Sequence, residues 1–81
     1  MTDIGSAVHT ALCDHLNIDD GRGSRKAVAG HLGIHPVQYS RYVTEGGPAA
    51  MAHLVRWARE RGITVHLGPD RVWCTREVTV G

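Results

Sequence analysis

The sequence predicts a mainly α-helical domain of the α+β class, in which four or five helices precede a C-terminal β-hairpin. Through residues 1–62, hydrophobic residues recur at three- and four-residue spacing, as they do on one face of a helix. From residue 63 onward, hydrophobic and polar residues alternate, as they do in a half-buried strand. The chain has 81 residues, of which 42% are hydrophobic, and this length supplies one small core. We therefore treat residues 1–81 as a single domain.

The first helix is predicted by one hydrophobic stripe, and Thr2 or Asp3 can cap its start. The stripe contains Ile4, Ala7, Val8, Ala11, Leu12 and Leu16. A loop over Asn17–Gly23 follows and contains the adjacent Asp19 and Asp20. A calcium loop would need more oxygen ligands at regular spacing, so we interpret both aspartates as turn formers.

A second helix is predicted from Ser24, a good N-cap whose hydroxyl can accept a hydrogen bond from a free backbone N–H. Its inward face combines two hydrophobic residues with one small residue that admits a neighbouring helix: Val28, Leu32 and Ala29. Gly33 follows directly, and glycine readily adopts the left-handed conformation in which a chain often leaves a helix. The sequence therefore predicts a sharp turn at Gly33.

A third helix is predicted immediately after this turn. We expect Ile34 to point inward, His35 to be extended because a proline follows it, and Pro36 to occupy the first helical position. The inward residues of this helix are Tyr39, Tyr42 and Val43. The outward residues are Val37, Gln38, Ser40, Arg41 and Thr44. Two short helices joined in this way form a helix-turn-helix, whose second helix can enter the major groove of B-DNA.

This segment resembles the helix-turn-helix of phage Cro- and CI-type repressors and of YdaS-like antitoxin regulators. The resemblance is carried by Ala29, by Leu32-Gly33-Ile34, by Tyr39 and Tyr42, and by Gly46 at the end of the second helix of the motif. It covers about a quarter of the chain, or about half with the flanking helices. The family often has Gln at the positions of Arg25 and Pro36, and since Pro36 has no side-chain donor, base reading would shift to its neighbours. The resemblance implies a helix-turn-helix bundle that binds DNA.

A further helix is predicted from Pro48, with Trp57 at its edge and Gly62 at its end. Its inward residues are Met51, Leu54, Val55 and Ala58. Its last turns carry Arg56, Arg59 and Arg61. Cations there favour the C-terminus of a helix whether or not DNA is present, so we prefer a structural interpretation of these arginines.

Residues 63–81 have the pattern of a β-hairpin with a turn at residues 68–71. A lone hairpin is marginal in water and leaves an open edge. Three arrangements are therefore open. The hairpin can act as a dimerisation arm that pairs with a twofold mate, it can fold onto the helices of its own chain, or it can lie on DNA as a wing.

The formal net charge of +1 is unevenly distributed. Residues 1–21 carry a charge of −4, residues 22–61 carry +5, and residues 62–81 are neutral. The basic segment surrounds the helix-turn-helix, as a phosphate-facing surface requires, although basic helix faces also occur as ordinary solvated surface.

We expect two groups of DNA-contacting residues. The group for base reading is His35, Pro36, Val37, Gln38, Ser40 and Arg41. Arg41 is the strongest candidate, because a guanidinium can donate two hydrogen bonds to guanine. The group for phosphate contact is Arg22, Ser24, Arg25, Lys26 and Thr44.

The histidines and cysteines give little indication of a metal site. His9 and Cys13 are one helical turn apart with His15 nearby, whereas His31 and His35 lie on either side of the glycine turn. No set of these residues supplies the full ligand spacing of a structural zinc site. We therefore expect no metal and no cofactor.

Enzymatic and membrane functions have no support in the sequence. It contains no recognisable nucleophile–base pair and no glycine-rich phosphate loop, so we expect neither catalysis nor a small-molecule substrate. Cys13 and Cys74 do not make a disulfide framework, and the N-terminus lacks the pattern of a signal peptide. No apolar run is long enough to span a membrane. We expect a cytoplasmic protein without a membrane partner.

The sequence thus predicts a transcriptional regulator that binds double-stranded DNA, a phage-type repressor acting on a palindromic operator as a homodimer. The alternative is a protein-interaction module on a helix-turn-helix fold, as in an antitoxin or a phage protein that binds a host protein. The apolar Pro36 and Val37 at the exposed start of a helix keep this alternative open.

Overall fold

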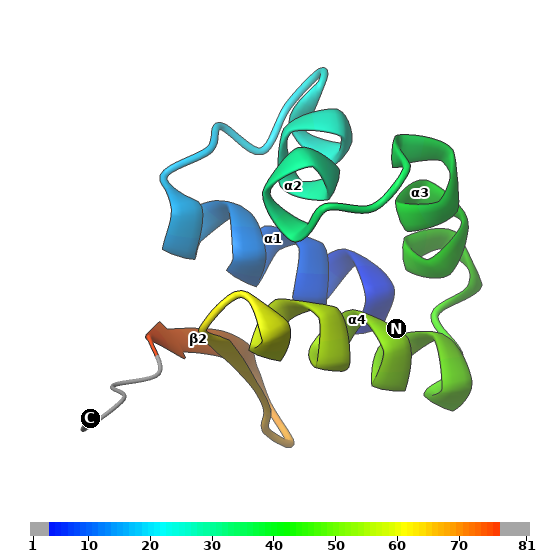
Figure 1. Ribbon diagram of the computed structural model, residues 1–81. Coiled ribbons are helices and arrows are strands. Elements are labelled where there is room, and N and C mark those ends of the chain that lie inside the picture. The colour runs from blue at the N-terminus through cyan, green and yellow to red at the C-terminus, as the bar shows by residue number, and fades with distance from the viewer. Residues whose placement is uncertain (1–3, 77–81) are drawn as a thin grey trace.

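A computed structural model describes residues 4–76 of the chain. Its elements, in order, are α1 (Ile4–Leu16), α2 (Ser24–Leu32), α3 (Pro36–Glu45), α4 (Pro48–Glu60), β1 (Ile63–Leu67) and β2 (Val72–Arg76) (Figure 1). The α+β class, the helix-turn-helix and the C-terminal hairpin are confirmed, with four helices in the described part of the chain. The predicted caps Thr2 and Asp3 and the end of the second predicted strand lie outside the described residues.

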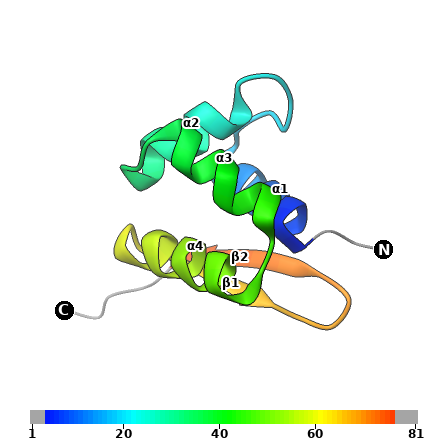
Figure 2. The same ribbon diagram turned by 90° about the vertical axis from the view of Figure 1, so that its right-hand side faces the viewer.

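Helix α1 lies in the middle of the fold (Figures 1 and 2). Helices α2 and α3 lie on one side of α1, and α4 and the hairpin lie on the other. Strand β1 packs against α4 and strand β2 against α1, so the hairpin folds onto the helices of its own chain. This is one of the three predicted arrangements, and the hairpin lies across α1 from α3. The DNA-contacting wing and the dimerisation arm stay predictions.

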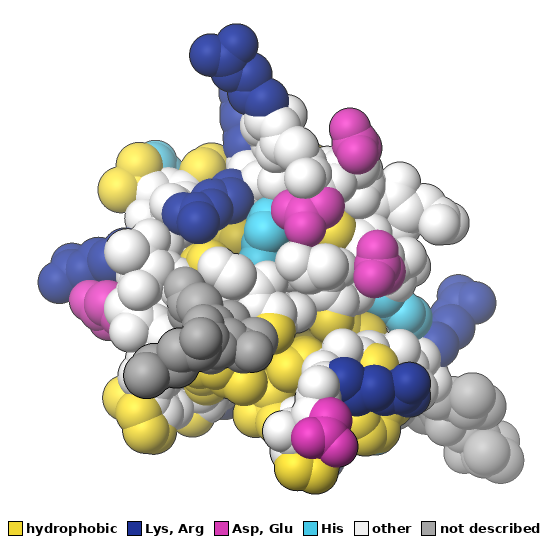
Figure 3. Space-filling view, turned by 180° about the vertical axis from the view of Figure 1, so that it is seen from behind, with side chains coloured by type: hydrophobic (Ala, Val, Ile, Leu, Met, Phe, Trp, Pro, Cys, Tyr) yellow, Lys and Arg dark blue, Asp and Glu magenta, His cyan; other side chains and the backbone are white. Residues whose placement is uncertain are grey.

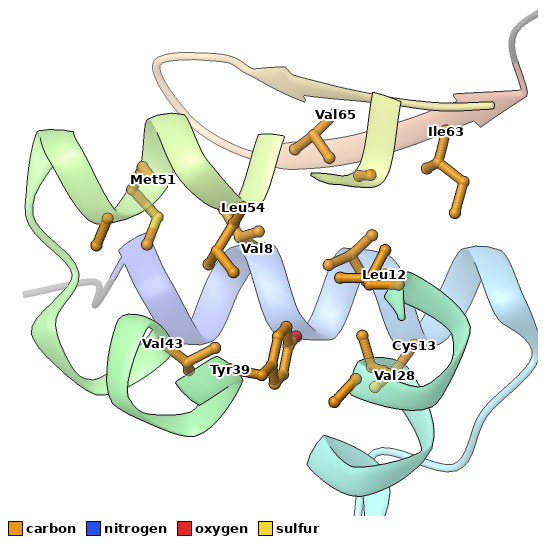
Figure 4. Packing of buried hydrophobic residues seen from close by; sticks show 14 residues of the cluster. Val8, Leu12, Cys13, Val28, Tyr39, Val43, Met51, Leu54, Ile63 and Val65 are labelled. Carbon is orange, nitrogen blue, oxygen red and sulfur yellow. The ribbon is translucent and has the colours of Figure 1, made fainter. Parts of the chain in front are cut away.

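The core sits where all the elements meet around α1. Figure 4 shows Val8 of α1 close to Leu54 of α4, and Ile63 and Val65 pointing from the hairpin toward the helices. Tyr39 reaches from α3 toward α1 and is fully buried. Most of the side chains that the helical and strand periodicity placed inward thus form one continuous cluster, whereas Leu67, at the end of β1, is 50% exposed.

The hairpin has a different chemistry on each face. Its inner face carries the buried Ile63 and Val65 and the half-buried Val72 and Cys74. On its outer face, His66 pairs with Trp73 across the strands, and their rings stack with centroids 5.0 Å apart. The guanidinium of Arg71 lies 4.8 Å from the centre of the Trp73 ring. The outer face is therefore covered by its own aromatic and cationic side chains.

The turn between α2 and α3 has the predicted geometry. Gly33 ends α2 in the left-handed conformation, with φ of 72°. His35 is extended, with φ of −66° and ψ of 134°, and Pro36 begins α3. Gly46 ends α3, again with a positive φ of 61°. The glycine and proline positions of the motif thus match their conformational requirements.

The predicted N-cap role of Ser24 is wrong. Gly23 is the N-cap residue in the left-handed conformation, with φ of 84°, and Ser24 is already helical. Helix α2 therefore begins at Ser24, one residue before the predicted start, because Gly23 can adopt the left-handed conformation at the N-cap position. The Ser24 hydroxyl is buried and is hydrogen-bonded to His9 Nε2 at 2.9 Å.

Candidate nucleic-acid interface

The outward face of α3 holds most of the residues expected to read bases. Its exposed side chains are Val37, Gln38, Arg41 and Thr44, and Ser40 is half-buried. Val37 is 70% exposed, a high value for a large apolar side chain. On the opposite face, Tyr39 and Val43 are buried, so the predicted division of this helix into inward and outward faces is confirmed.

An aromatic cluster fixes the inner edge of α3 against α4. The Tyr42 ring lies 5.3 Å from the His53 ring and 5.2 Å from the Trp57 ring, centroid to centroid. His53 and Trp57 stack on each other at 5.7 Å. Each such pair stabilises the fold by about 0.5–1.5 kcal/mol beyond the contribution of the apolar area that it buries. The cluster holds α3 in place without using its outward face.

A shallow groove of about 600 Å³ runs between α2 and the outward face of α3. It is lined by Arg25 and Lys26 from α2 and by α3 residues that include Pro36, Val37, Ser40 and Arg41. A second hollow of about 410 Å³ is lined by His35, Val37, Gln38, Arg41 and Tyr42. Val37 and Arg41 border both hollows and therefore form the ridge between them.

Arg25 connects the two helices of the motif. Its Nη1 donates to Ser40 Oγ at 2.7 Å and to Thr44 Oγ1 at 3.4 Å. A guanidinium carries several further N–H donors, so these two bonds from one nitrogen leave capacity for a phosphate. Arg25 thus both orients α3 and offers positive charge beside it, a double role that the sequence did not indicate.

Arg41 forms an exposed ion pair one helical turn along α3. Its Nε lies 3.2 Å from Glu45 Oε1, with side-chain exposures of 77% and 51%. Exposed pairs of this spacing contribute about 0.3–0.5 kcal/mol. Because a bidentate contact with a base is worth about 1–3 kcal/mol, Arg41 can leave Glu45 for a guanine at little cost.

The remaining expected contacts divide into accessible and inaccessible residues. Arg22 and Lys26 are exposed near the start of α2. His35 is exposed and its Nδ1 accepts a hydrogen bond from the Val37 N–H at 3.2 Å, which caps α3. Ser24 is 5% exposed and bonded to the interior, so it is not available to a phosphate.

A buried polar cluster lies behind the motif and was not anticipated as a unit. His9 on α1 is bonded through Nδ1 to Tyr39 Oη at 2.7 Å and through Nε2 to Ser24 Oγ at 2.9 Å. Burial lowers the pKa of His9 below its ordinary value of 6.5, and this effect outweighs the Asp20 carboxylate, which raises the pKa. Burial also raises the pKa of the Tyr39 phenol. One neutral imidazole therefore ties α1 to both helices of the motif.

The same cluster includes the residues best suited to hold a metal ion. Ligand atoms of His9, Cys13 and Asp20 all lie within 4.8 Å of one another. The sequence indicated the pairing of His9 with Cys13 on one helix face but not the return of the loop that brings Asp20 to them. No local pattern could have found it, because Asp20 reaches α1 only through the path of the loop.

The surface away from the motif is more apolar. Figure 3 shows hydrophobic side chains gathered in the lower half of the back of the molecule, with Lys and Arg side chains mostly around the rim. A groove of about 660 Å³ on α4 is lined by residues that include Ile4, Met51, Val55, Arg56 and Leu67. None of the helices in the described range is both long and apolar enough to cross a membrane.

Comparisons of this chain with models of known protein families, with curated proteins and with solved structures found no match. The function therefore has to be inferred from the geometry and charge of the interface.

Proposed function

We propose that this protein is a sequence-specific regulator that binds double-stranded DNA and inserts α3 into the major groove. The observation that carries the proposal is the convergence of Arg25, Lys26 and Arg41 on one groove beside an exposed helix face. Cations beside a helix that can enter the groove provide both phosphate attraction and access to base edges.

The chemistry of the ridge suits the reading of base edges. Arg41 can donate to guanine O6 and N7, and Gln38 can pair with adenine N6 and N7. The Val37 side chain offers an apolar contact for a thymine methyl group. Both Val37 and Gln38 lie in the first turn of α3, the part of a recognition helix that contacts base edges.

The start of α2 supplies the contacts to phosphate. Arg22, Arg25 and Lys26 are exposed around the first turn of this helix. The free backbone N–H groups at a helix N-terminus favour an anion at the same place. These contacts position the protein on the duplex and carry no sequence information.

A helix as short as α3 contacts few base pairs, so the proposed regulator acts as a homodimer on a palindromic operator. Two half-sites about 34–36 Å apart present the same face of the duplex to two copies of the motif. Occupancy of such a site blocks transcription, and the proposed activity is therefore that of a repressor.

The test begins with selection of bound sequences from a random duplex library, which identifies the operator and its symmetry. Arg41→Ala is expected to weaken binding to the selected site by about 1–3 kcal/mol and to relax preference at one base position. Lys26→Ala is expected to weaken selected and scrambled DNA alike and to lower the salt slope by about one. Arg59→Ala, on α4 outside the groove between α2 and α3, is the matched control and should change neither.

If Arg41→Ala lowered the affinity for selected and scrambled DNA equally, Arg41 would not be a base-reading residue. A library selection without any enriched sequence would contradict the proposed specificity as a whole.

A protein-interaction role is the second candidate, and the 70% exposure of Val37 favours it. An apolar side chain at the centre of a surface can anchor a protein partner as well as a thymine methyl group. The dependence of binding on salt concentration distinguishes the two roles. DNA binding should weaken steeply between low and high salt, whereas an apolar protein interface should change little.

A further inference from the structure

Three groups with metal-binding chemistry converge where α1 meets the loop before α2. Cys13 Sγ lies 3.5 Å from His9 Nε2, and Asp20 Oδ1 lies 3.5 Å from the same nitrogen. All three ligand atoms lie within 4.8 Å of one another. His9 and Cys13 are buried on one face of α1, whereas Asp20 is exposed in the loop.

These separations match those around a zinc ion. Nitrogen and oxygen donors lie about 2.0–2.1 Å and a thiolate about 2.3 Å from a tetrahedral zinc ion, so the donors of such a set lie about 3.3–3.6 Å from one another. The two distances from His9 Nε2 already have this value. The remaining gap, between Cys13 and Asp20, can close by movement of the Asp20 side chain, which is 44% exposed.

Two of the three groups also have the supporting partners that metal ligands commonly have. The second ring nitrogen of His9, Nδ1, is hydrogen-bonded to Tyr39 Oη at 2.7 Å, which orients the ring. Thr10 Oγ1 donates to Asp20 Oδ2 at 2.9 Å and leaves Oδ1 directed at His9. Such outer partners fix the orientation of histidine and carboxylate ligands in metal sites.

The site has an access route and a fourth ligand position. A cleft of about 410 Å³ is lined by residues that include His9, Thr10, Asp20 and Ser24. Ser24 Oγ is 2.9 Å from His9 Nε2, so an incoming ion would replace the Ser24 hydroxyl as the partner of this nitrogen. The displaced hydroxyl or a water molecule can then complete a tetrahedron. Arg25 also lines the cleft and opposes a cation, but a thiolate and a carboxylate together outweigh its charge.

We infer that His9, Cys13 and Asp20 form a site for one divalent cation of the zinc class, which binds through Nε2, Sγ and Oδ1. On binding, a bond forms between the metal and Sγ, the thiol proton of Cys13 leaves to solvent, and no group changes its oxidation state. Affinity therefore rises with pH.

The bound ion would join parts of the chain that the helix-turn-helix depends on. It would link α1 to the loop and, through the ring of His9, to Tyr39 on α3. A ligand that binds the folded state and not the unfolded state stabilises the fold by mass action. The expected consequence is a higher thermal midpoint in the presence of zinc.

The experiment uses the full chain, freed of metal with a chelator and then titrated with Co²⁺ as a spectroscopic probe. The wild-type protein should show a thiolate-to-cobalt charge-transfer band that saturates at one equivalent and disappears when Zn²⁺ is added. Cys13→Ser should abolish the band, and Cys74→Ser, the matched control, should retain it. Asp20→Asn, at an exposed position, should weaken Co²⁺ binding about tenfold or more while leaving the far-ultraviolet circular dichroism unchanged.

The inference is overturned if the wild-type protein shows no thiolate band at stoichiometric Co²⁺. It is also overturned if the band survives in Cys13→Ser, is lost in Cys74→Ser, or is unaffected by Asp20→Asn. No DNA is present in this experiment, so its outcome is independent of the proposed regulatory function.

Discussion

Helices α1 and α3 approach each other closely at Gly5, where α1 crosses α3. A Cβ atom built on Gly5 would lie 2.9 Å from the carbonyl carbon of Val43 and 3.3 Å from its Cα, and closer still to its carbonyl oxygen. These are backbone atoms, so no side-chain rotation relieves the contact. The substitution Gly5→Ala therefore requires α1 and α3 to move apart.

The expected loss follows from two opposing terms. Overpacking a filled interior costs about 1–3 kcal/mol, and a clash with backbone belongs at the upper end of that range. Alanine recovers up to about 1 kcal/mol through its higher helix propensity. The net destabilisation is about 2 kcal/mol. For a domain of this size, each kcal/mol corresponds to about 4–8 °C in the thermal midpoint, so the midpoint should fall by about 8–16 °C.

Gly30→Ala is the matched control. Gly30 is also helical and is exposed, and a Cβ built on it meets nothing within 4 Å. Only the propensity term applies there, so this variant should be more stable by about 0.5–1 kcal/mol. Thermal and urea unfolding followed by circular dichroism measure both changes. A Gly5→Ala protein as stable as the wild type would refute the close approach of the two helices.

Two further predictions concern buried polar groups. In the presence of a chelator, Tyr39→Phe should lower the free energy of unfolding by about 1–3 kcal/mol, because it leaves the buried Nδ1 of His9 without its partner, whereas Tyr42→Phe should change it by less than about 0.5 kcal/mol. Urea unfolding of the two variants decides this, and equal losses would contradict it. Burial raises the pKa of the Cys74 thiol from 9.0 to about 11. At pH 8, alkylation of this thiol in a Cys13→Ser background should therefore be about a hundredfold slower in the folded than in the urea-unfolded protein, and equal rates would contradict the shift.

The sequence was most informative where a local rule decides the structure. The conformations of Gly33 and Pro36 and the two faces of α3 follow from turn chemistry and helical periodicity, and all were predicted correctly. The partners of His9 were not predictable in this way, because Ser24 and Tyr39 lie 15 and 30 residues away along the chain. Periodicity reports which side of a helix is buried, but it does not report which distant polar group lies opposite.

The same distinction applies to the candidate interface. The exposure of Arg41 could be predicted from its place on α3, whereas its pairing with Glu45 is one of several options open to an exposed side chain. The bridge from Arg25 to Ser40 depends on the angle between α2 and α3, which no residue near either position specifies. The close approach at Gly5 likewise depends on how two helices cross.

The layered fold restricts how the proposed homodimer can form. The hairpin and α3 lie on opposite sides of α1, so two copies joined through the outer face of the hairpin would direct their α3 helices away from each other. Neighbouring major grooves on one face of DNA are about 34–36 Å apart. The molecule measures 38 × 28 × 23 Å, so two copies lying side by side on DNA match this spacing.

The proposed dimer must therefore form through a surface other than the outer face of the hairpin. A charged residue placed on that outer face should be tolerated. Thr75 is exposed on that face, opposite Thr64 in the hairpin register. Thr75→Glu should leave the sedimentation behaviour unchanged and the operator affinity within about threefold, since surface substitutions usually change free energies by less than about 0.5 kcal/mol. At a twofold contact through the hairpin, the same substitution would bring two like charges together and separate the copies. Loss of the dimer in Thr75→Glu would thus place the dimer contact at the hairpin and contradict the expectation that the outer face of the hairpin is free.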